Sequence, residues 1–144
     1  MTDPVAGLRE MARVTRPGGV VVACVWDHAG GNGPLGMFWS MARELDPGVT
    51  DESHLAGTRE GHLAHLFAAA DLRSVESTTL LADLEMPTFD AWWEPFTRGV
   101  GPAGAYVAGL NARQRHALRD RCHAHLGAEP FTIVARAWAA RGRT

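Results

Sequence analysis

The chain has 144 residues, of which 46% are hydrophobic and 21% charged, and its formal net charge at pH 7 is -2. These values are typical of one globular domain over residues 1–144, and they exclude the strongly basic surface of most nucleic-acid-binding proteins. No apolar run reaches the roughly 18 residues of a membrane span, so we expect neither nucleic acid nor a membrane among the partners.

Two cysteines, Cys24 and Cys122, are too few for a disulfide framework. They indicate reduced thiols, which are typical of cytoplasmic proteins, so we expect a cytoplasmic location. Cys24 lies inside an apolar run and is interpreted as a small core residue.

A helix, a turn and a strand are predicted at the start of the chain. Asp3 is a suitable N-cap for a helix over Pro4–Thr15, and the sequence RPGG at residues 16–19 ends this helix because proline cannot continue it. Val20–Trp26 is apolar and rich in β-branched residues, without the polar alternation of a half-exposed strand. This pattern predicts a strand covered on both faces, as in a parallel sheet.

Helices and two more strands alternate along the rest of the chain. The predicted helices cover residues 34–45, 59–70, a short segment capped by Thr88, and 111–126, and the predicted strands cover residues 73–84 and 131–140. The segment between residues 99 and 109 is interpreted only as rich in glycine, proline and alanine. The order of elements predicts an α/β fold with about three strands.

The segment Leu8–Asp27, LREMARVTRPGGVVVACVWD, resembles the later half of class I S-adenosylmethionine-dependent methyltransferases, the group that includes the ubiquinone/menaquinone-biosynthesis methyltransferases. In that family a helix ending in R-x-x-R-P-G-G leads into the fifth strand of a seven-stranded sheet. The matching residues here are Arg13, Arg16, Pro17, Gly18 and Gly19.

Two later segments match the family in the same order. The helix Glu60–Ala70 and the residues after it resemble F-x-x-A-G-L-x-x-V, with Asp71 in place of the usual glycine. Phe131–Arg141 resembles the closing strand, which in the family runs antiparallel between its two neighbours. The resemblance implies a partial Rossmann-like methyltransferase sheet of about three strands, the last one antiparallel, with flanking and lid helices.

The resemblance covers only the C-terminal half of the family domain. The glycine-rich cofactor loop, the acidic residue after the second strand and the fourth strand would all precede residue 1. The resemblance thus implies a methyltransferase-like protein that transfers a methyl group from S-adenosylmethionine to an unknown small molecule, but with the cofactor-binding half missing. We expect this chain alone to bind no S-adenosylmethionine. The alternative is an inactive truncated fragment that acts as a binding or dimerisation module.

The strand at residues 20–26 is expected to have one unpaired edge. In the family layout this strand pairs on one side with a strand that the chain lacks. Proteins normally cover such an edge, because its open backbone donors and acceptors template further pairing. We therefore expect a homo-oligomer, a strand exchange or a partner chain to cover the edge of residues 20–26.

The residues Gly31, Gly33 and Gly36 form a G-x-G-x-x-G sequence between a strand and a helix, which makes them candidate cofactor-binding residues. In a true fingerprint the first glycine comes directly off the strand, but here His28, Ala29 and Gly30 intervene, and no second strand follows at the expected spacing. These departures favour a flexible loop beside a substrate pocket over a dinucleotide site.

Aromatic residues are the candidate lining of a pocket for a small-molecule substrate, since ligands of open α/β sheets bind beyond the carboxyl ends of the strands. They are Trp26, Phe38, Trp39, Trp92, Trp93, Phe96 and Tyr106. The alternative is ordinary packing, because aromatic stripes at helical spacing usually fill cores.

Asp27 and His28 follow the first strand and are candidate catalytic residues. A carboxylate or imidazole at this place could orient or deprotonate the hydroxyl or amine that receives a methyl group. A polar pair of loop residues without a catalytic role is the alternative. The histidines have poorly converging spacings, as in Cys122-His123-Ala124-His125, so we expect no metal site.

Overall fold

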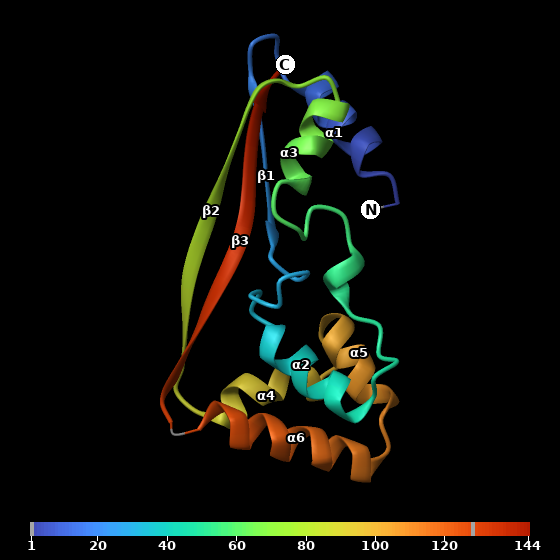
Figure 1. Cartoon of the computed structure of the whole chain (residues 1–144), viewed down its shortest axis with the longest axis vertical. Helices are drawn as coiled ribbons and strands as arrows, with labels where there is room; N and C mark the ends of the chain where they lie inside the picture. The colour runs from blue at the N-terminus through green and yellow to red at the C-terminus, as the bar shows by residue number, and fades with distance from the viewer. Residues whose placement is uncertain (1, 128) are drawn as a thin grey trace.

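The computed structural model describes residues 2–127 and 129–144 and contains six α-helices, one 3-10 turn and three strands in those residues. The helices are α1 (Pro4–Val14), α2 (Gly36–Leu45), α3 (His62–Ala69), α4 (Phe89–Thr97), α5 (Gly101–Gly109) and α6 (Ala112–Leu126), and the 3-10 turn η1 is Glu52–His54. The strands are β1 (Val20–Trp26), β2 (Arg73–Met86) and β3 (Phe131–Arg143) (Figure 1).

Side-chain caps begin the helices where the sequence predicts them. The Asp3 carboxylate accepts a hydrogen bond from the Ala6 N–H at 2.9 Å, and the Thr88 hydroxyl accepts one from the Ala91 N–H at 3.1 Å. Asn111 begins α6 with a reciprocal capping box. Each cap satisfies an N–H group that has no partner inside its helix, which fixes where the helix starts.

The three strands form one sheet in the order β1-β3-β2, with both neighbouring pairs antiparallel. The prediction that the last strand lies antiparallel between the other two is therefore confirmed. Because β1 and β2 both run opposite to β3, they are parallel to each other, and their carboxyl ends point to the same end of the molecule (Figure 1).

The prediction that β1 is covered on both faces is wrong for the described residues. Val21 is buried, whereas Val22 is 63% exposed and Val20 and Cys24 are also exposed. The reason is that α1 and α3, on either side of β1 in the chain, pack against one and the same face. Cys24 is therefore an exposed thiol and not the core residue that its apolar neighbours predict.

One edge of β1 is also unpaired in the described residues. Asp27, which directly follows β1, donates its N–H to the carbonyl oxygen of Arg136 in β3. In an antiparallel ladder, alternate residues bond to the same neighbour, so the even-numbered residues of β1 direct their backbone groups to the other side. The N–H and C=O groups of Val20, Val22 and Cys24 thus face the free edge.

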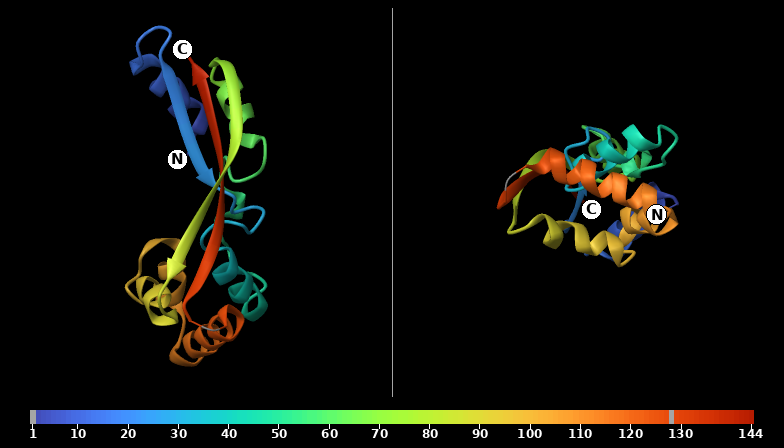
Figure 2. Two further views of the ribbon diagram at one scale, coloured as in Figure 1. Left: turned by 90° about the vertical axis from the view of Figure 1, so that its left-hand side faces the viewer. Right: turned by 90° about the horizontal axis from the view of Figure 1, so that it is seen from below.

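The buried side chains form two separate clusters along the long β2–β3 ribbon. One cluster joins α1 and α3 to the sheet through residues such as Val21, Phe67 and Ala140. The other joins the remaining helices and includes Ile133 at its boundary. Residues 133 and 140 point to opposite faces of β3, so the ribbon must twist to offer both faces to helices. Figure 2 shows this twist where the two strands cross.

Among residues 2–127 and 129–144, no helix combines the length and the apolar character needed to cross a membrane.

Candidate functional site

The helices α2, α4, α5 and α6 form a group that we call the cap, at the end of the molecule opposite α1 and α3 (Figure 1). The connection after β1 contributes α2, and the connection from β2 to β3 contributes the other three helices. Both connections leave from carboxyl ends of the parallel strands β1 and β2. This is the place where open α/β sheets bind their ligands.

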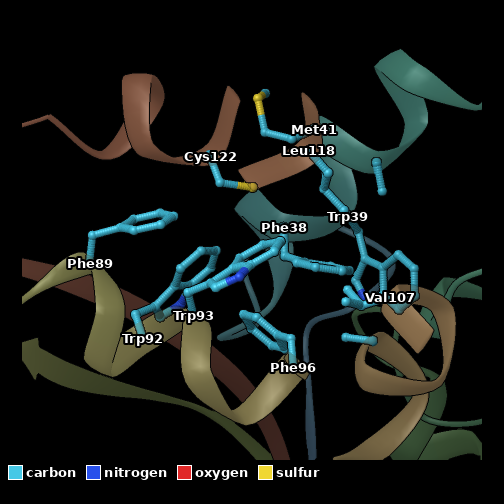
Figure 3. Packing of buried hydrophobic residues seen from close by; sticks show 12 residues of the cluster. Phe38, Trp39, Met41, Phe89, Trp92, Trp93, Phe96, Val107, Leu118 and Cys122 are labelled. Carbon is cyan, nitrogen blue, oxygen red and sulfur yellow. The ribbon is translucent and has the colours of Figure 1, made fainter. Parts of the chain in front are cut away.

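Most of the predicted substrate-binding aromatics lie in the interior of the cap, as Figure 3 shows for those it labels. The Phe38 and Phe96 rings lie 4.7 Å apart between centroids, and Phe38 contacts Trp39 edge-on at 5.0 Å. Phe38 is fully buried, and Trp93 is 5% exposed. These contacts favour the packing interpretation for Phe38 and Trp93, whose rings chiefly stabilise the cap.

Two predicted aromatics lie outside the buried interior of the cap, although one of them belongs to the cap helix α5. Tyr106 packs half-buried at the boundary of the cap core, and burial raises the pKa of its hydroxyl. Trp26, at the end of β1, is half-buried and belongs to neither core cluster. The cap therefore brings together six of the seven aromatic candidates and leaves Trp26 apart.

A cavity of about 410 Å³ lies between the cap and the β2–β3 ribbon. We call it the cap pocket. Its apolar wall includes Leu35 of the loop before α2, Trp92 and Phe96 of α4, and Ile133 of β3. This volume lies in the range of about 300–1,000 Å³ that is typical of small-molecule sites. Two of the predicted substrate-binding residues, Trp92 and Phe96, thus line a cavity that a ligand could enter.

Of the described residues that line the cap pocket, Glu52 alone is ionisable. It belongs to η1, in a segment for which the sequence predicts no element and no function. Its carboxylate oxygen Oε2 accepts a hydrogen bond from the indole Nε1–H of Trp39 at 2.9 Å. Sequence reasoning assigns no pocket role to Glu52, because it lies in an irregular polar loop and not at a strand end. Only the tertiary contact with Trp39, 13 residues away in the chain, brings it to the cap pocket.

Asp27 organises the loop after β1. Its Oδ1 accepts from the Gly30 N–H at 2.9 Å, and its Oδ2 accepts from the Asn32 side-chain amide at 2.7 Å. The Arg136 guanidinium lies 3.7 Å from the same oxygen. Asp27 is 2% exposed, and both of its carboxylate oxygens are occupied by the loop that it holds.

His28, the second catalytic candidate, lines a different cavity of about 290 Å³ between α1, β1 and α3. The neighbouring walls are apolar and include Leu8 and Val25. His28 and Asp27 are consecutive in the chain, but the structure does not direct them into one pocket. Their proposed shared role in catalysis remains a prediction.

The glycine loop does not fit a phosphate-bearing cofactor. The backbone N–H groups of residues 30 to 33 all donate inside the loop, to Asp27 or to the His28 carbonyl, and the Gly36 N–H donates to the Gly33 carbonyl. A dinucleotide site needs such N–H groups to be free for the pyrophosphate. A Cβ atom on Gly36 would lie 1.8 Å from the Gly31 carbonyl oxygen, so glycine is required here by the loop's own backbone.

In the part of the chain that the structure describes, no group of three His, Cys, Asp or Glu residues is placed to hold a metal ion. Cys122 is fully buried in the cap, and burial raises the pKa of its thiol to about 12. A thiol in this state is inert as a nucleophile and as a metal ligand.

No family model matches the chain, and no curated protein matches it at a significant level.

Proposed function

We propose that this chain forms the substrate-binding half of a class I S-adenosylmethionine-dependent methyltransferase, with a partial Rossmann-like sheet, and that the cap pocket receives a small-molecule methyl acceptor. The observation that carries the proposal is the strand order β1-β3-β2, with β3 antiparallel between two strands that are parallel to each other. This is the order that the family resemblance implies for the last three strands of its sheet. The reduced thiols support a cytoplasmic location as part of the same proposal.

The conformation of Asp71 gives independent support. Asp71 stands where the resembled motif has glycine, and its φ angle is +63°. Left-handed backbone of this kind costs a non-glycine residue roughly 1 kcal/mol, and glycine adopts it freely. The position therefore has the backbone geometry for which the family's glycine is suited, although the residue itself differs.

The cofactor site lies outside the described elements in this proposal. The loop after β1 has its backbone donors engaged, so none of its residues is assigned to S-adenosylmethionine. The free edge of β1 is where further polypeptide would extend the sheet and bring a cofactor site beside the cap. S-adenosylmethionine would supply the electrophilic methyl group there, and the residues of this chain would bind and orient the acceptor.

The test joins the first four strands of a class I methyltransferase to the N-terminus of this chain. We expect the fusion to transfer labelled methyl groups from S-adenosylmethionine to an apolar phenol such as 2-naphthol. We also expect amide exchange at Val20, Val22 and Cys24 to be at least tenfold slower than in the chain alone at a concentration low enough to keep it monomeric, because the added half pairs with the β1 edge. The chain alone should give no saturable heat with S-adenosylmethionine in calorimetry.

Val22→Pro provides the matched control. This change removes an N–H that points to the free edge and leaves the bonds from β1 to β3 intact. The fusion that carries Val22→Pro should lose both the slowed amide exchange along the β1 edge and the methyl transfer. If the original fusion binds S-adenosylmethionine while those three amides exchange as fast as in the monomeric chain alone, the proposal is wrong. Tight binding of S-adenosylmethionine by the chain alone would also contradict it.

A binding or dimerisation module is the second candidate function, and the open edge of β1 favours it. The residues there, Val20, Val22 and Cys24, carry neither charge nor proline, which proteins commonly use to prevent edge pairing. A chain that acts in this way would pair its β1 edge with another chain and would not need a cofactor. The fusion experiment separates the two candidates, because only the methyltransferase proposal requires label transfer.

A further inference from the structure

We infer that the cap pocket selects a ligand with an apolar body and one hydrogen-bond donor, a hydroxyl or an amine, and that Glu52 accepts the bond from that donor. Only the statement that this ligand is a methyl acceptor rests on the proposed function. The binding itself requires nothing beyond residues of this chain. Glu52 would be a binding residue, and Trp39, which acts through it, a positioning residue.

The wall of the cap pocket defines the apolar part of the ligand. Trp92 and Phe96 contribute aromatic surface from α4, and Leu35 and Ile133 contribute aliphatic surface from the loop before α2 and from β3. Trp92 and Phe96 also contact each other edge-on at 5.0 Å, which holds both rings in place. A flat apolar ligand with one ring or two fused rings would be stabilised against such a surface by dispersion and by the removal of apolar area from water.

Glu52 defines the polar part. Trp39 is 4% exposed and rigidly packed, so its indole N–H holds Glu52 Oε2 in a fixed place. No other hydrogen bond from the described residues reaches this carboxylate, which leaves Oε1 available to a ligand. A carboxylate that already has one fixed oxygen accepts a second bond with little loss of side-chain entropy.

The basic residues close to Glu52 act on its neighbour Asp51. His54, in the same 3-10 turn, and Arg43 on α2 both lower the pKa of the Asp51 carboxyl, and Arg43 forms an ion pair with it. Among residues 2–127 and 129–144, Glu52 forms no ion pair, and no arginine or histidine lines the cap pocket. The pocket therefore disfavours anionic ligands such as carboxylates and phosphates. It favours donors, because a hydrogen bond to an ionised acceptor is about twice as strong as a neutral one.

The experiment compares four naphthalene probes on the intact chain by calorimetry and by NMR of the tryptophan indole N–H signals. We expect 2-naphthol and 2-naphthylmethylamine to bind at least about tenfold more tightly than naphthalene and 2-methoxynaphthalene, which have no donor. The ranking of the hydroxyl and amine probes identifies which donor the site takes. The Trp39 and Trp92 indole signals should shift on binding.

Glu52→Gln keeps an acceptor for Trp39 but removes the negative charge. We expect it to weaken 2-naphthol binding about tenfold and to change naphthalene binding less than threefold. Glu44→Gln is the matched control, because Glu44 lies on α2, pairs with Arg121 and does not line the cap pocket. A second variant, Ala91→Phe, places a ring at an exposed wall position and should abolish binding of all four probes.

Three results would overturn the inference. They are equal binding of donor and donor-free probes, unchanged 2-naphthol binding in Glu52→Gln, and binding of no probe to the intact chain. Its failure is distinguishable from that of the proposed function. Glu52-dependent binding of 2-naphthol without label transfer by the fusion would reject the methyltransferase proposal alone, and label transfer without Glu52 dependence would reject this inference alone.

Discussion

The backbone N–H of Asp27 donates to the carbonyl oxygen of Arg136 at 2.9 Å, and the Arg136 guanidinium lies 3.7 Å from the Asp27 carboxylate. The N–H of Arg136 in turn donates to the Asn32 carbonyl at 2.7 Å. These contacts join the end of β1 and the following loop to the middle of β3. They fix the direction in which the chain leaves β1 toward the cap, and so they position one wall of the cap pocket.

Asp27→Asn should destabilise the protein by about 1–3 kcal/mol. The new amide can still accept from Gly30, but its NH₂ group then faces the NH₂ group of Asn32, which keeps only its 3.1 Å bond to the Gly30 carbonyl. Urea unfolding measures the change in the free energy of unfolding. Asp90→Asn is the control, because Asp90 forms an exposed ion pair with Arg119 and should lose at most about 1 kcal/mol. Equal effects of the two changes would contradict the structural role of Asp27.

Asp71→Gly should stabilise the protein by about 0.5–1 kcal/mol, since glycine adopts the observed φ of +63° without strain. The exposed ion pair between Asp71 and Arg9, at 3.5 Å, contributes too little to reverse the gain. Thermal unfolding measures the effect as a rise in Tm. Asp71→Ala keeps the strain and loses the ion pair, so it should lower Tm. A lower Tm for the glycine variant would show that this position does not need left-handed backbone.

The chain alone should self-associate through β1. Val20 and Val22 expose apolar side chains beside an edge whose backbone groups are open, and such edges template pairing between chains. Sedimentation velocity should show an average mass that rises with concentration. Val22→Lys should weaken the association at least tenfold, because it places a charge at the edge. Val134→Lys is the control, since Val134 is similarly exposed but lies on the central strand. A monodisperse monomer with fast amide exchange at Val20 and Val22 would contradict this prediction.

The buried thiol of Cys122 should make stability depend on alkaline pH. Burial raises its pKa from 9.0 to about 12, so the unfolded chain releases the thiol proton at lower pH than the folded chain does. The stability that the buried, protonated thiol gives to the folded chain is therefore fully present below pH 9 and is lost as the pH rises toward 12. The slope approaches about 1.4 kcal/mol per pH unit at its steepest.

Cys122→Ala removes this component of the pH dependence, and urea unfolding between pH 8 and about pH 11 measures the difference from the parent chain. Cys24→Ala is the control, because Cys24 is exposed and its removal should leave the pH dependence as it was. If the free energy of unfolding changes with pH in the same way for the parent chain and for Cys122→Ala, this pH dependence does not come from Cys122, which contradicts the assignment. Rapid reaction of Cys122 with a thiol reagent in the folded protein would contradict it as well.

Local signals in the sequence determined most elements and their boundaries. The cap residues Asp3, Thr88 and Asn111 mark three helix starts, because their side chains satisfy N–H groups within one turn. The RPGG turn places the start of β1 correctly for a similar reason: proline and glycine act on the backbone nearby. Interactions that span three or four residues can be predicted from the residues themselves.

The tertiary structure alone decided the elements and sites that depend on distant contacts. The glycine-rich segment 101–109 becomes helix α5, whose buried Val107 packs into the cap and offsets a poor helix propensity. The apolar run of β1 did not reveal that both neighbouring helices cover the same face. Glu52 reaches the cap pocket only because the fold brings Trp39 to it. Burial and hydrogen bonding between residues far apart in the chain set these outcomes, and a local pattern carries no information about them.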